Sequence, residues 1–403
     1  MNLCDLTQFY SPLSGGVKRY VHEKIRYIQS TANDEHVLII PGPKTERIEA
    51  ESSRIYSIAS PLLSRRSRYR VLLNLRAIEE ILEREQPHLI ESGDPYQVGW
   101  KAIASGLALH VPVIGFYHSH FSEAYLRTSS RLLGLTGTHF AMDMARRYVR
   151  QIYNRFAATL VPSARLGQLL ADWGVRNVHA VDLGVNTEAF RSEPDDARST
   201  RESLGIPPER CLLLYVGRLA QEKNTQTLWA AFATLVRREP ERYHLLVIGD
   251  GLQRGALRKL QEHVGAVSWR QYCTGSEELS RFYRAADLMV HPGVQETFGL
   301  TALESQACGT PVVGIRGSYM DRIIFSSQEH WARENSAEAL ADAIATTTAA
   351  GGLAAAGLKA ASVVHAHYAW PVVFKKIFQI YGEVRTSWNP GGQRSACETV
   401  APR

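Results

Sequence analysis

Short apolar runs alternate along the first half of the chain with longer segments in which apolar residues recur every three or four positions. The runs typical of buried strands are 2–6, 36–40, 88–91, 111–117 and 158–161. The segments with helical spacing are 18–28, 69–84 and 96–109. Repeated strand and helix predict a parallel sheet covered on both faces, which binds ligands at the carboxyl ends of its strands.

The same alternation begins again after a surface segment, 191–210, that is rich in Asp, Ser, Pro and Arg. Strands are predicted at 211–217, 244–248, 287–291 and 310–315. Helices are predicted at 225–237, 252–263, 300–308, 335–347 and 353–365. The chain of 403 residues is therefore expected to be of the α/β class and, by its length, to form two domains or one large one.

The composition is ordinary for a globular protein, with 45% hydrophobic and 21% charged residues. The net charge of +6 favours anionic partners such as nucleotides, phospholipid head groups or nucleic acid, without choosing among them. No motif of a nucleic-acid-binding protein is present. The cysteines lack metal-ligand spacing, which predicts buried thiols in a reducing compartment and makes a zinc site unexpected.

The sequence also bears on membranes. The N-terminus lacks the basic flank and apolar core of a signal peptide, and no run approaches the ~18 apolar residues that cross a bilayer. We therefore expect a cytoplasmic protein, or one bound to the inner face of the membrane. Arg65, Arg66 and Arg68, and the mixed basic and apolar segment 126–155, suit an anionic membrane surface. A solvated face, a dimer interface or a site for a phosphorylated acceptor would have the same composition.

The most informative stretch is 291–313, in which a strand ends, a glycine-bearing loop follows at 293–299, and a helix begins. The N–H groups at the start of a helix favour an anion, so this helix start is predicted to bind an anion such as a diphosphate. The groups concerned belong to Phe298, Gly299, Leu300 and Thr301. Glu296 lies at the lip of the loop and Glu304 one turn inside the helix. One of these two carboxylates can therefore face the reacting end of a ligand, while the other contacts polar groups in the rest of the ligand.

A second strand end carries two basic residues. The apolar strand that ends at Gly217 is followed by Arg218 and Lys223, which can converge on one anion across the turn into the next helix. Such a pair would neutralise a departing diphosphate, as the loss of a sugar from its nucleotide requires. An unrelated surface arginine and lysine is the alternative interpretation.

Two strand ends in the first half add further candidates. Gly15 and Gly16 follow the first strand, where paired glycines permit close approach to a phosphate or sugar, although a plain tight turn would use them too. Lys18 and Arg19 could face the same anion or only solvent. His118 leaves another strand end among polar and aromatic neighbours, and a satisfied structural histidine is the alternative. The reserve candidates beside it are His120 and Glu123.

Together these motifs resemble those of the retaining GT-B glycosyltransferases (glycosyl transferases group 1, family 4), which include sucrose synthases and phosphatidylinositol mannosyltransferases. The spacing of Glu296 and Glu304 matches the E-x(7)-E signature of this family, with Phe298–Leu300 between them and Gly309–Val313 after them. Gly217–Asn224 matches its Gly-Arg-Leu-x-x-x-Lys-Asn motif. The likeness covers nearly the whole chain. It weakens after residue 313, where Asp321 would replace the glutamate of a Gly-x-x-Glu pattern.

The resemblance implies two Rossmann-like doubly wound domains that face each other across a cleft. Residues 1–183 would form the acceptor-binding domain and 184–370 the domain that binds the nucleotide-sugar donor. The segment 371–385 would cross back to the first domain as a helix. Residues 386–403 are predicted to be a disordered tail.

The resemblance also implies roles for individual residues. The expected catalytic residues are Glu296, His118, Arg218 and Lys223. The expected diphosphate-binding residues are Gly15, Gly16, Arg218, Lys223, Phe298, Gly299, Leu300 and Thr301. The expected nucleoside-binding residues are Glu304, Asp250, Gly251 and Gly275. The histidine would hydrogen-bond a hydroxyl of the transferred sugar rather than transfer a proton. No metal and no cofactor are expected, because the two basic side chains and the helix dipole neutralise the diphosphate.

The implied activity is the transfer of a hexosyl unit, with retention of configuration, from a UDP- or GDP-sugar to a hydroxyl acceptor such as a glycan, a lipid or a small metabolite. Two alternatives remain open at this point. One is a nucleotide-sugar-binding protein without turnover, and the other is an epimerase or phosphorylase of the same fold.

Overall fold

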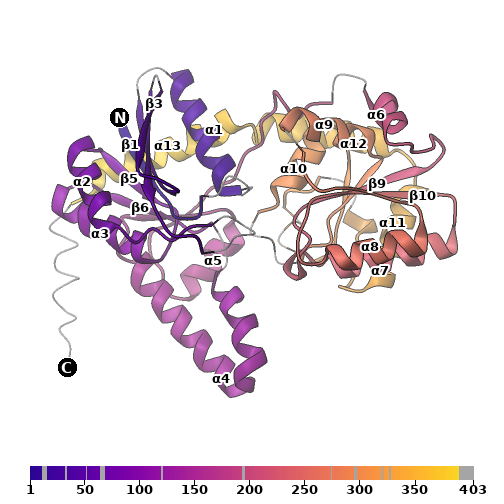
Figure 1. Ribbon diagram of the computed structural model, residues 1–403, viewed down its shortest axis with the longest axis horizontal. Helices are drawn as coiled ribbons and strands as arrows, with labels where there is room; N and C mark the ends of the chain where they lie inside the picture. The colour runs from indigo at the N-terminus through magenta and orange to yellow at the C-terminus, as the bar shows by residue number, and fades with distance from the viewer. Residues whose placement is uncertain are drawn as a thin grey trace. The chain divides into compact units, whose positions relative to one another are not determined.

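The computed structural model describes residues 1–10, 16–31, 34–50, 52–63, 69–118, 121–192, 196–273, 275–294, 296, 298–318, 320, 322–325 and 328–389, with the backbone alone for 121–136. Its contacts divide the chain into two compact units (Figure 1). Unit 1 is Met1–Asp182 together with the segment from Val373 onward, and unit 2 is Leu183–Val372. The predicted domain boundaries, 183/184 and 370/371, lie beside these divisions.

In its described residues, unit 1 contains an eight-stranded sheet in the order β3-β4-β2-β1-β5-β6-β7-β8. The strands are β1 (Asn2–Leu6), β2 (Glu35–Gly42), β3 (Glu46–Ala50), β4 (Ser53–Ala59), β5 (Leu89–Ser92), β6 (Val113–Phe116), β7 (Ala158–Val161) and β8 (Val178–Ala180). Neighbouring strands pair in parallel, apart from β3 and β4, which are antiparallel. The strand order reverses between β1 and β5, which is where doubly wound sheets bind ligands.

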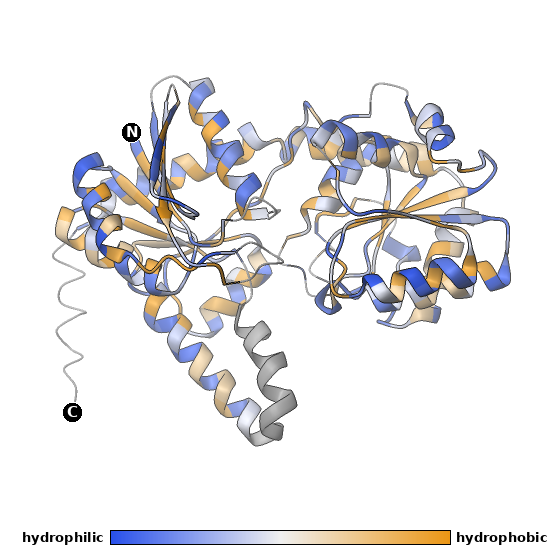
Figure 2. Ribbon diagram, in the orientation of Figure 1, coloured by the Kyte–Doolittle hydropathy of each residue, from blue (hydrophilic) through white to orange (hydrophobic). Residues whose placement is uncertain are grey.

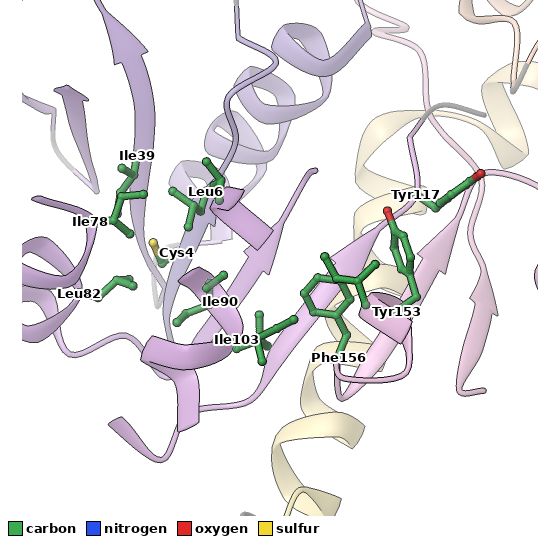
Figure 3. Packing of buried hydrophobic residues seen from close by; sticks show 14 of the residues in the cluster. Cys4, Leu6, Ile39, Ile78, Leu82, Ile90, Ile103, Tyr117, Tyr153 and Phe156 are labelled. Atoms are coloured by element: carbon green, nitrogen blue, oxygen red, sulfur yellow. The ribbon is translucent and has the colours of Figure 1, made fainter. Parts of the chain in front are cut away.

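Helices cover this sheet. They are α1 (Gly16–Thr31), α2 (Leu75–Glu85), α3 (Gln97–Leu109), α4 (Phe121–Tyr153), α5 (Ala164–Asp172) and α13 (Trp370–Ser387). Every residue of β5, β6 and β7 is buried, as expected for a parallel sheet covered on both faces. The strands accordingly appear hydrophobic in Figure 2. Figure 3 shows Ile78 and Leu82 of α2 beside Cys4 of β1 and Ile39 of β2, in the core that these elements form.

A buried charged cluster joins α1, α13 and the sheet of unit 1. Lys24 Nζ lies 2.8 Å from Asp5 Oδ1 and 3.0 Å from Glu91 Oε1, and its side chain is completely buried. The Tyr381 hydroxyl of α13 accepts a hydrogen bond from Lys24 and donates one to Glu91. Burial would raise the pKa of Asp5, but Lys24 and a hydrogen bond from His36 hold it well below its usual range. Burial raises the pKa of Glu91 to about 7 although Lys24 acts in the opposite direction.

The part of unit 2 that the structure describes contains a five-stranded parallel sheet in the order β11-β10-β9-β12-β13. Its strands are β9 (Cys211–Val216), β10 (Tyr243–Ile248), β11 (Val267–Arg270), β12 (Leu288–Val290) and β13 (Val312–Val313). Its helices are α6 (Ala197–Ser203), α7 (Thr225–Arg238), α8 (Arg254–Val264), α9 (Ser276–Ala285), α10 (Leu300–Ala307), α11 (Ala337–Ala349) and α12 (Leu353–His367). The two sheets confirm the predicted α/β class with two doubly wound domains.

The C-terminal helix passes from one unit to the other, as predicted. Its first residue, Trp370, donates its backbone N–H to the carbonyl of Val185 within unit 2 at 3.2 Å. From Val373 onward the helix belongs to unit 1, where the Phe374 ring lies 5.7 Å from that of Tyr20. The predicted disordered tail begins inside this helix, which extends through Ser387, so the prediction is wrong for its first residues. Residues 390–403 of the predicted tail lie outside the described residues.

One other element prediction is wrong, and one pair of strands was missed. The helix predicted at 69–84 begins only at Leu75, because the chain before it forms main-chain bonds with an earlier segment. Leu63 N–H donates to Tyr69 O at 2.8 Å, and Val71 N–H donates to Pro61 O at 3.0 Å. The antiparallel pair of β3 and β4 was not predicted, because β3 is an exposed edge strand with no apolar run.

The prediction that the cysteines are buried thiols is wrong for two of them, since Cys211 and Cys273 are half-buried.

Among the described residues, no single helix is long and apolar enough to cross a bilayer. The pair α11 and α12 together reaches the required length and composition, with a bend of 99° between the two helices. The arginines predicted to bind a membrane surface, Arg65, Arg66 and Arg68, lie outside the described residues.

Candidate functional site

The strands β9 and β12 at the centre of unit 2 are neighbours, so the loops that follow them start at the same edge of the sheet. The loop after β9 begins with Gly217 and passes very close to Gly249, which follows β10. A Cβ atom on Gly249 would lie 1.9 Å from the Gly217 carbonyl oxygen, and its φ is +140°. Glycine is therefore required where these two backbones approach each other.

Lys223 and Glu296 form the centre of the candidate site. Lys223 Nζ lies 2.6 Å from Glu296 Oε1 and 2.7 Å from Oε2. The lysine ends a short 3₁₀ turn, Gln221–Lys223, after β9, whereas the glutamate belongs to the loop after β12. Asn224 adopts a left-handed φ of 55° and donates from Nδ2 to the Pro292 carbonyl at 2.9 Å. This bond joins the two loops directly beside the ion pair.

The Glu296 carboxylate stays ionised although its side chain is only 12% exposed. Burial would raise the pKa of Glu296, but the charge and hydrogen bonds of Lys223, with smaller effects of His291 and Arg218, lower it below its usual value. Buried His291 directly follows β12, and burial lowers its pKa. A Cβ atom on Gly293 would lie 2.9 Å from Glu296 Oε1 and 3.0 Å from His291 Cε1. A larger residue at position 293 would therefore displace the Glu296 carboxylate or the His291 ring from its present place.

Arg218 has a different carboxylate partner. Its Nη2 lies 2.7 Å from Glu222 Oε1, and both side chains are substantially exposed, at 62% and 47%. The Arg218 carbonyl accepts a hydrogen bond from the Tyr215 hydroxyl at 3.0 Å, which fixes the turn after β9. Arg218 and Lys223 therefore lie in the same turn but contact separate carboxylates, and their predicted convergence on one anion stays a prediction.

The predicted helix start is present at the end of the loop that carries Glu296. Gly299 precedes α10 with a φ of 95°, and a Cβ atom there would lie 2.1 Å from the Met320 side chain. Phe298 is buried, whereas Leu300 and Thr301, the first residues of the helix, are half-buried. The N–H groups of a first helical turn have no partner within the helix. The backbone thus supplies the amide groups predicted to bind a diphosphate.

The residues predicted to bind the nucleoside have contacts of their own in the structure. Glu304 is 1% exposed, and its Oε2 accepts a hydrogen bond from the Tyr283 hydroxyl at 3.0 Å. Asp250 Oδ1 accepts the N–H of Gly251 at 2.7 Å. Gly275 precedes α9 with open space around it. Their role toward a nucleoside stays a prediction.

In unit 1, His118 follows β6 and lines a small pocket. The lining residues are Phe9, Gly93, Pro95, Tyr96, Phe116, His118 and Tyr153. The His118 ring stacks on Phe116 with 3.9 Å between the ring centroids. Burial, reinforced by the charge of Lys24, lowers the pKa of His118 to about 3. The ring is therefore neutral at physiological pH, which suits the predicted hydrogen bond to a hydroxyl group.

Asp94, which directly follows Gly93 of the pocket lining, was not predicted. It is 1% exposed, and its Oδ2 accepts the backbone N–H of Gln8 at 3.0 Å. Its Oδ1 has no hydrogen-bond partner in the part of the chain that the structure describes. Burial raises the pKa of Asp94 to about 7. The sequence signal that could have identified Asp94 is its position just after β5, at the carboxyl edge of the sheet.

Some predicted residues cannot be placed. Gly15 and His120 lie outside the described residues, as does the side chain of Glu123, whereas Gly16 is the first residue of α1. Among the residues that are described, no three His, Cys, Asp or Glu side chains gather as metal ligands would.

Two family models match the chain, one in each unit. Residues 14–189 match the family described as Glycosyltransferase Family 4, and residues 196–354 match the family described as Glycosyl transferases group 1. The predicted resemblance is thereby confirmed, because each half matches a glycosyltransferase family independently.

Individual relatives agree with the family models. D-inositol 3-phosphate glycosyltransferase 2 of Catenulispora acidiphila is 36% identical over 239 residues, which are 55% of this chain and 52% of that protein. The chain thus spans about half the length of this relative. GDP-mannose-dependent alpha-mannosyltransferase of Corynebacterium glutamicum is 25% identical over 78% of this chain and 72% of its own. Sucrose-phosphate synthase from Thermosynechococcus elongatus has a similar fold, with a TM-score of 0.76 at 20% identity, covering 96% of this chain and 100% of its own.

Proposed function

This chain belongs to the glycosyltransferases described by these two family models, and we propose that it transfers a hexosyl unit from a UDP- or GDP-sugar to a hydroxyl acceptor, with retention of configuration. The observation that carries the proposal is the contact between Lys223 and Glu296, at the point where the strand order of unit 2 reverses. A cation and an ionised carboxylate meet there beside the start of α10. In a nucleoside diphosphate sugar, the diphosphate would pair with this cation and the polar sugar ring would contact this carboxylate.

In the proposed reaction, the diphosphate binds to Lys223 and to the backbone N–H groups at the start of α10, and Arg218 approaches it from the exposed side of the same turn. The bond between the anomeric carbon and the diphosphate oxygen breaks, and negative charge collects on the diphosphate. Fixed positive charges and helix dipoles stabilise that charge more than they stabilise the bound donor, which lowers the barrier. The acceptor hydroxyl then bonds to the same face of the sugar, and its proton passes to the departing diphosphate.

Glu296 is proposed to orient the sugar and to stabilise the positive charge that develops on its ring. Its lowered pKa keeps it anionic, and the glycine at position 293 lets it lie close to the backbone of the loop. The carboxylate faces Lys223 and is therefore held near the place assigned to the diphosphate. Glu304, Asp250, Gly251 and Gly275 are proposed to contact the nucleoside.

Unit 1 is proposed to bind the acceptor, in the pocket that His118 lines. Neutral His118 would hydrogen-bond a hydroxyl group, and the aromatic residues would contact the apolar face of a sugar or cyclitol ring. A glycan, a lipid or a small polyol each presents such hydroxyl groups. The role assigned to unit 2 does not depend on which of these acceptors binds.

Nucleoside diphosphates are expected to stabilise the folded protein, which tests the donor site directly. A ligand present at about 100 times its Kd adds about 2.7 kcal/mol to the free energy of unfolding and raises the melting temperature by several degrees. We expect this increase with UDP or GDP, but not with both equally and not with ADP. The Lys223→Ala variant should lose the effect, whereas Lys259→Ala, at an exposed lysine of α8, should retain it. No response to any of the three nucleotides would contradict the proposal.

Removal of divalent cations is expected to leave transfer unchanged. The proposal assigns neutralisation of the diphosphate to two basic side chains and a helix start, so it requires no Mg²⁺ or Mn²⁺. Initial rates measured with excess EDTA and with added Mg²⁺ should therefore agree within about twofold. A loss of activity of tenfold or more with EDTA, restored by the metal, would show that a cation does this work instead.

A further inference from the structure

Asp94 is a buried acid of unit 1 to which the proposed reaction gives no role. It is 1% exposed, and its Oδ2 accepts the backbone N–H of Gln8 at 3.0 Å. Its Oδ1 is also buried, and within the described part of the chain it has no hydrogen-bond partner. Buried polar atoms of folded proteins nearly always have a partner. This oxygen can therefore accept a hydrogen bond from a molecule that binds beside it.

The main chain around Asp94 is fixed by hydrogen bonds. The Asp94 carbonyl accepts a bond from the Ser92 hydroxyl at 3.3 Å. The carbonyl of the next residue, Pro95, accepts one from the Tyr148 hydroxyl, which in turn accepts Nε1–H of Trp100 at 3.2 Å. The carboxyl group is thus held in one place before a ligand binds, which reduces the entropic cost of binding.

Asp94 adjoins the small pocket that His118 lines. The residues on either side of it in sequence, Gly93 and Pro95, both line this pocket. Tyr153 is another lining residue. Burial raises the pKa of the Tyr153 hydroxyl, and the charges of neighbouring groups that include Asp94 raise it further. The carboxyl group therefore lies near the wall of the pocket.

Two further hydrogen-bonding groups lie beside Gly93. A Cβ atom on Gly93 would lie 3.2 Å from Thr7 Oγ1 and 3.5 Å from His118 Nε2. Thr7 directly follows β1, whereas Asp94 and His118 lie two residues after β5 and β6. These three strands are neighbours in the sheet. A hydroxyl, a carboxyl and an imidazole group are thus placed at the edge where the strand order reverses, which is where doubly wound sheets bind ligands.

The chemistry of these groups indicates a ligand that is rich in hydroxyl groups and carries no negative charge. All three groups form hydrogen bonds with hydroxyl groups, and the aromatic rings of the pocket suit the apolar face of a sugar or cyclitol. No lysine or arginine is among the described residues that line the pocket. Lys24, whose charge adds to burial in lowering the pKa of His118, is itself completely buried between Asp5 and Glu91. A phosphate group would therefore contact a carboxylate instead of the cation that it requires.

We propose that Asp94 is a specificity-determining residue of unit 1, which accepts hydrogen bonds from an uncharged sugar or cyclitol ring and excludes phosphorylated rings. Because the pocket is small, it takes the hydroxyl-bearing edge of the ring. His118 and Thr7 bind the neighbouring hydroxyl groups. Hydrogen bonds from the ring favour the ionised form of Asp94, whose charge repels a phosphate. The role of this ring as the acceptor rests on the proposed function.

The binding of matched neutral and phosphorylated rings to the unmodified chain tests the proposal. The probes are glucose, mannose and myo-inositol, each compared with its monophosphate ester. Ligand-observed NMR titrations in the presence of UDP or GDP give the Kd of each probe without requiring the donor sugar. We expect at least one neutral ring to bind with a Kd at least about tenfold lower than that of its phosphate ester. Equal or tighter binding of the esters, or binding of no neutral ring, would overturn the proposal.

Two variants connect this preference to the pocket. Asp94→Asn keeps an oxygen for the Gln8 N–H and removes the charge, so it should weaken binding of the neutral ring about tenfold and reduce the discrimination against its phosphate ester. Gly93→Ala places a methyl group between Thr7 and His118 and should weaken binding of both rings.

The matched control is Asp172→Asn, at an exposed acid of α5, which should bind the rings as the unmodified chain does. If Asp94→Asn lowers the melting temperature but binds neutral rings as this control does, Asp94 is a structural residue and the proposal is wrong.

The nucleotide-induced increase in melting temperature, measured on the same variants, separates this proposal from the proposed function. It should persist in Asp94→Asn and Gly93→Ala, because the donor site belongs to unit 2. Its absence in the unmodified chain would contradict the proposed function. Its presence together with equal binding of neutral and phosphorylated rings would contradict only the role of Asp94.

Discussion

Replacing Lys223 with Met, or Glu296 with Gln, is expected to lower the kcat of sugar transfer by about 10²–10³-fold, the usual effect of removing one group that stabilises transition-state charge. Each change keeps the approximate size of the side chain and removes one charge of the pair. Lys223→Met removes the cation assigned to the diphosphate. Glu296→Gln removes the anion assigned to the sugar. Initial rates at saturating donor give kcat, and the control Lys259→Ala should leave it unchanged.

The double variant K223M/E296Q separates a catalytic pair from a structural ion pair. Lys223 keeps Glu296 ionised within the protein, so Lys223→Met alone leaves a mostly buried carboxylate without its cation and should lower the melting temperature. The double variant has no charge to compensate and should recover most of that stability. If the pair acts on substrate, activity stays as low as in the single variants. Recovery of activity along with stability would show that the contact only holds two loops together.

The candidate residues of this site could be identified from sequence, because they are close to one another within two short motifs, and their roles stay predictions. A strand end followed by Arg218 and Lys223, and a loop that carries Glu296 into a helix, indicate an anion site from local rules alone. The contact between Lys223 and Glu296 could not be predicted, since it depends on β9 and β12 being neighbours in the sheet. The pairing of Arg218 with Glu222 was missed for another reason, because local spacing permits it and also permits the predicted convergence.

For the fold too, the sequence predicted the elements that have a local pattern and missed those that depend on contacts with distant residues. Apolar runs predicted β5, β6 and β7 because strands buried on both faces contain few polar residues. The edge strand β3 carries mainly charged residues and has no such signal. Tyr69 begins a segment with apolar residues at helical spacing, yet it forms the second arm of a hairpin, because bonds with Leu63 outweigh a local preference. Asp94 was missed because a single buried carboxylate has no periodic pattern.

Replacing Lys24 with Met is expected to lower the free energy of unfolding by about 3–5 kcal/mol, the usual cost of leaving a buried charge without its partner. Lys24 is completely buried between Asp5 and Glu91, and it also donates to Tyr381 of α13 at 3.1 Å. The variant therefore leaves two buried carboxylates and weakens the attachment of the C-terminal helix. The control Lys101→Met removes a partly exposed lysine whose Nζ lies 2.5 Å from Glu79. It should cost no more than about 1 kcal/mol.

The pH dependence of this loss identifies its cause. The pKa of Glu91 in the folded protein, about 7, lies above its unfolded value of about 4.3. Its contribution to stability is thus complete at low pH and is lost as the pH rises through 7. Without Lys24 the pKa of Glu91 rises further and the pKa of Asp5 rises from its low value, so each carboxyl must either stay protonated at neutral pH or ionise without its lysine partner. Urea unfolding should therefore show a larger difference between Lys24→Met and the unmodified chain at pH 8 than at pH 5. A difference that is constant or shrinks with pH would mean that Lys24 contributes packing rather than charge.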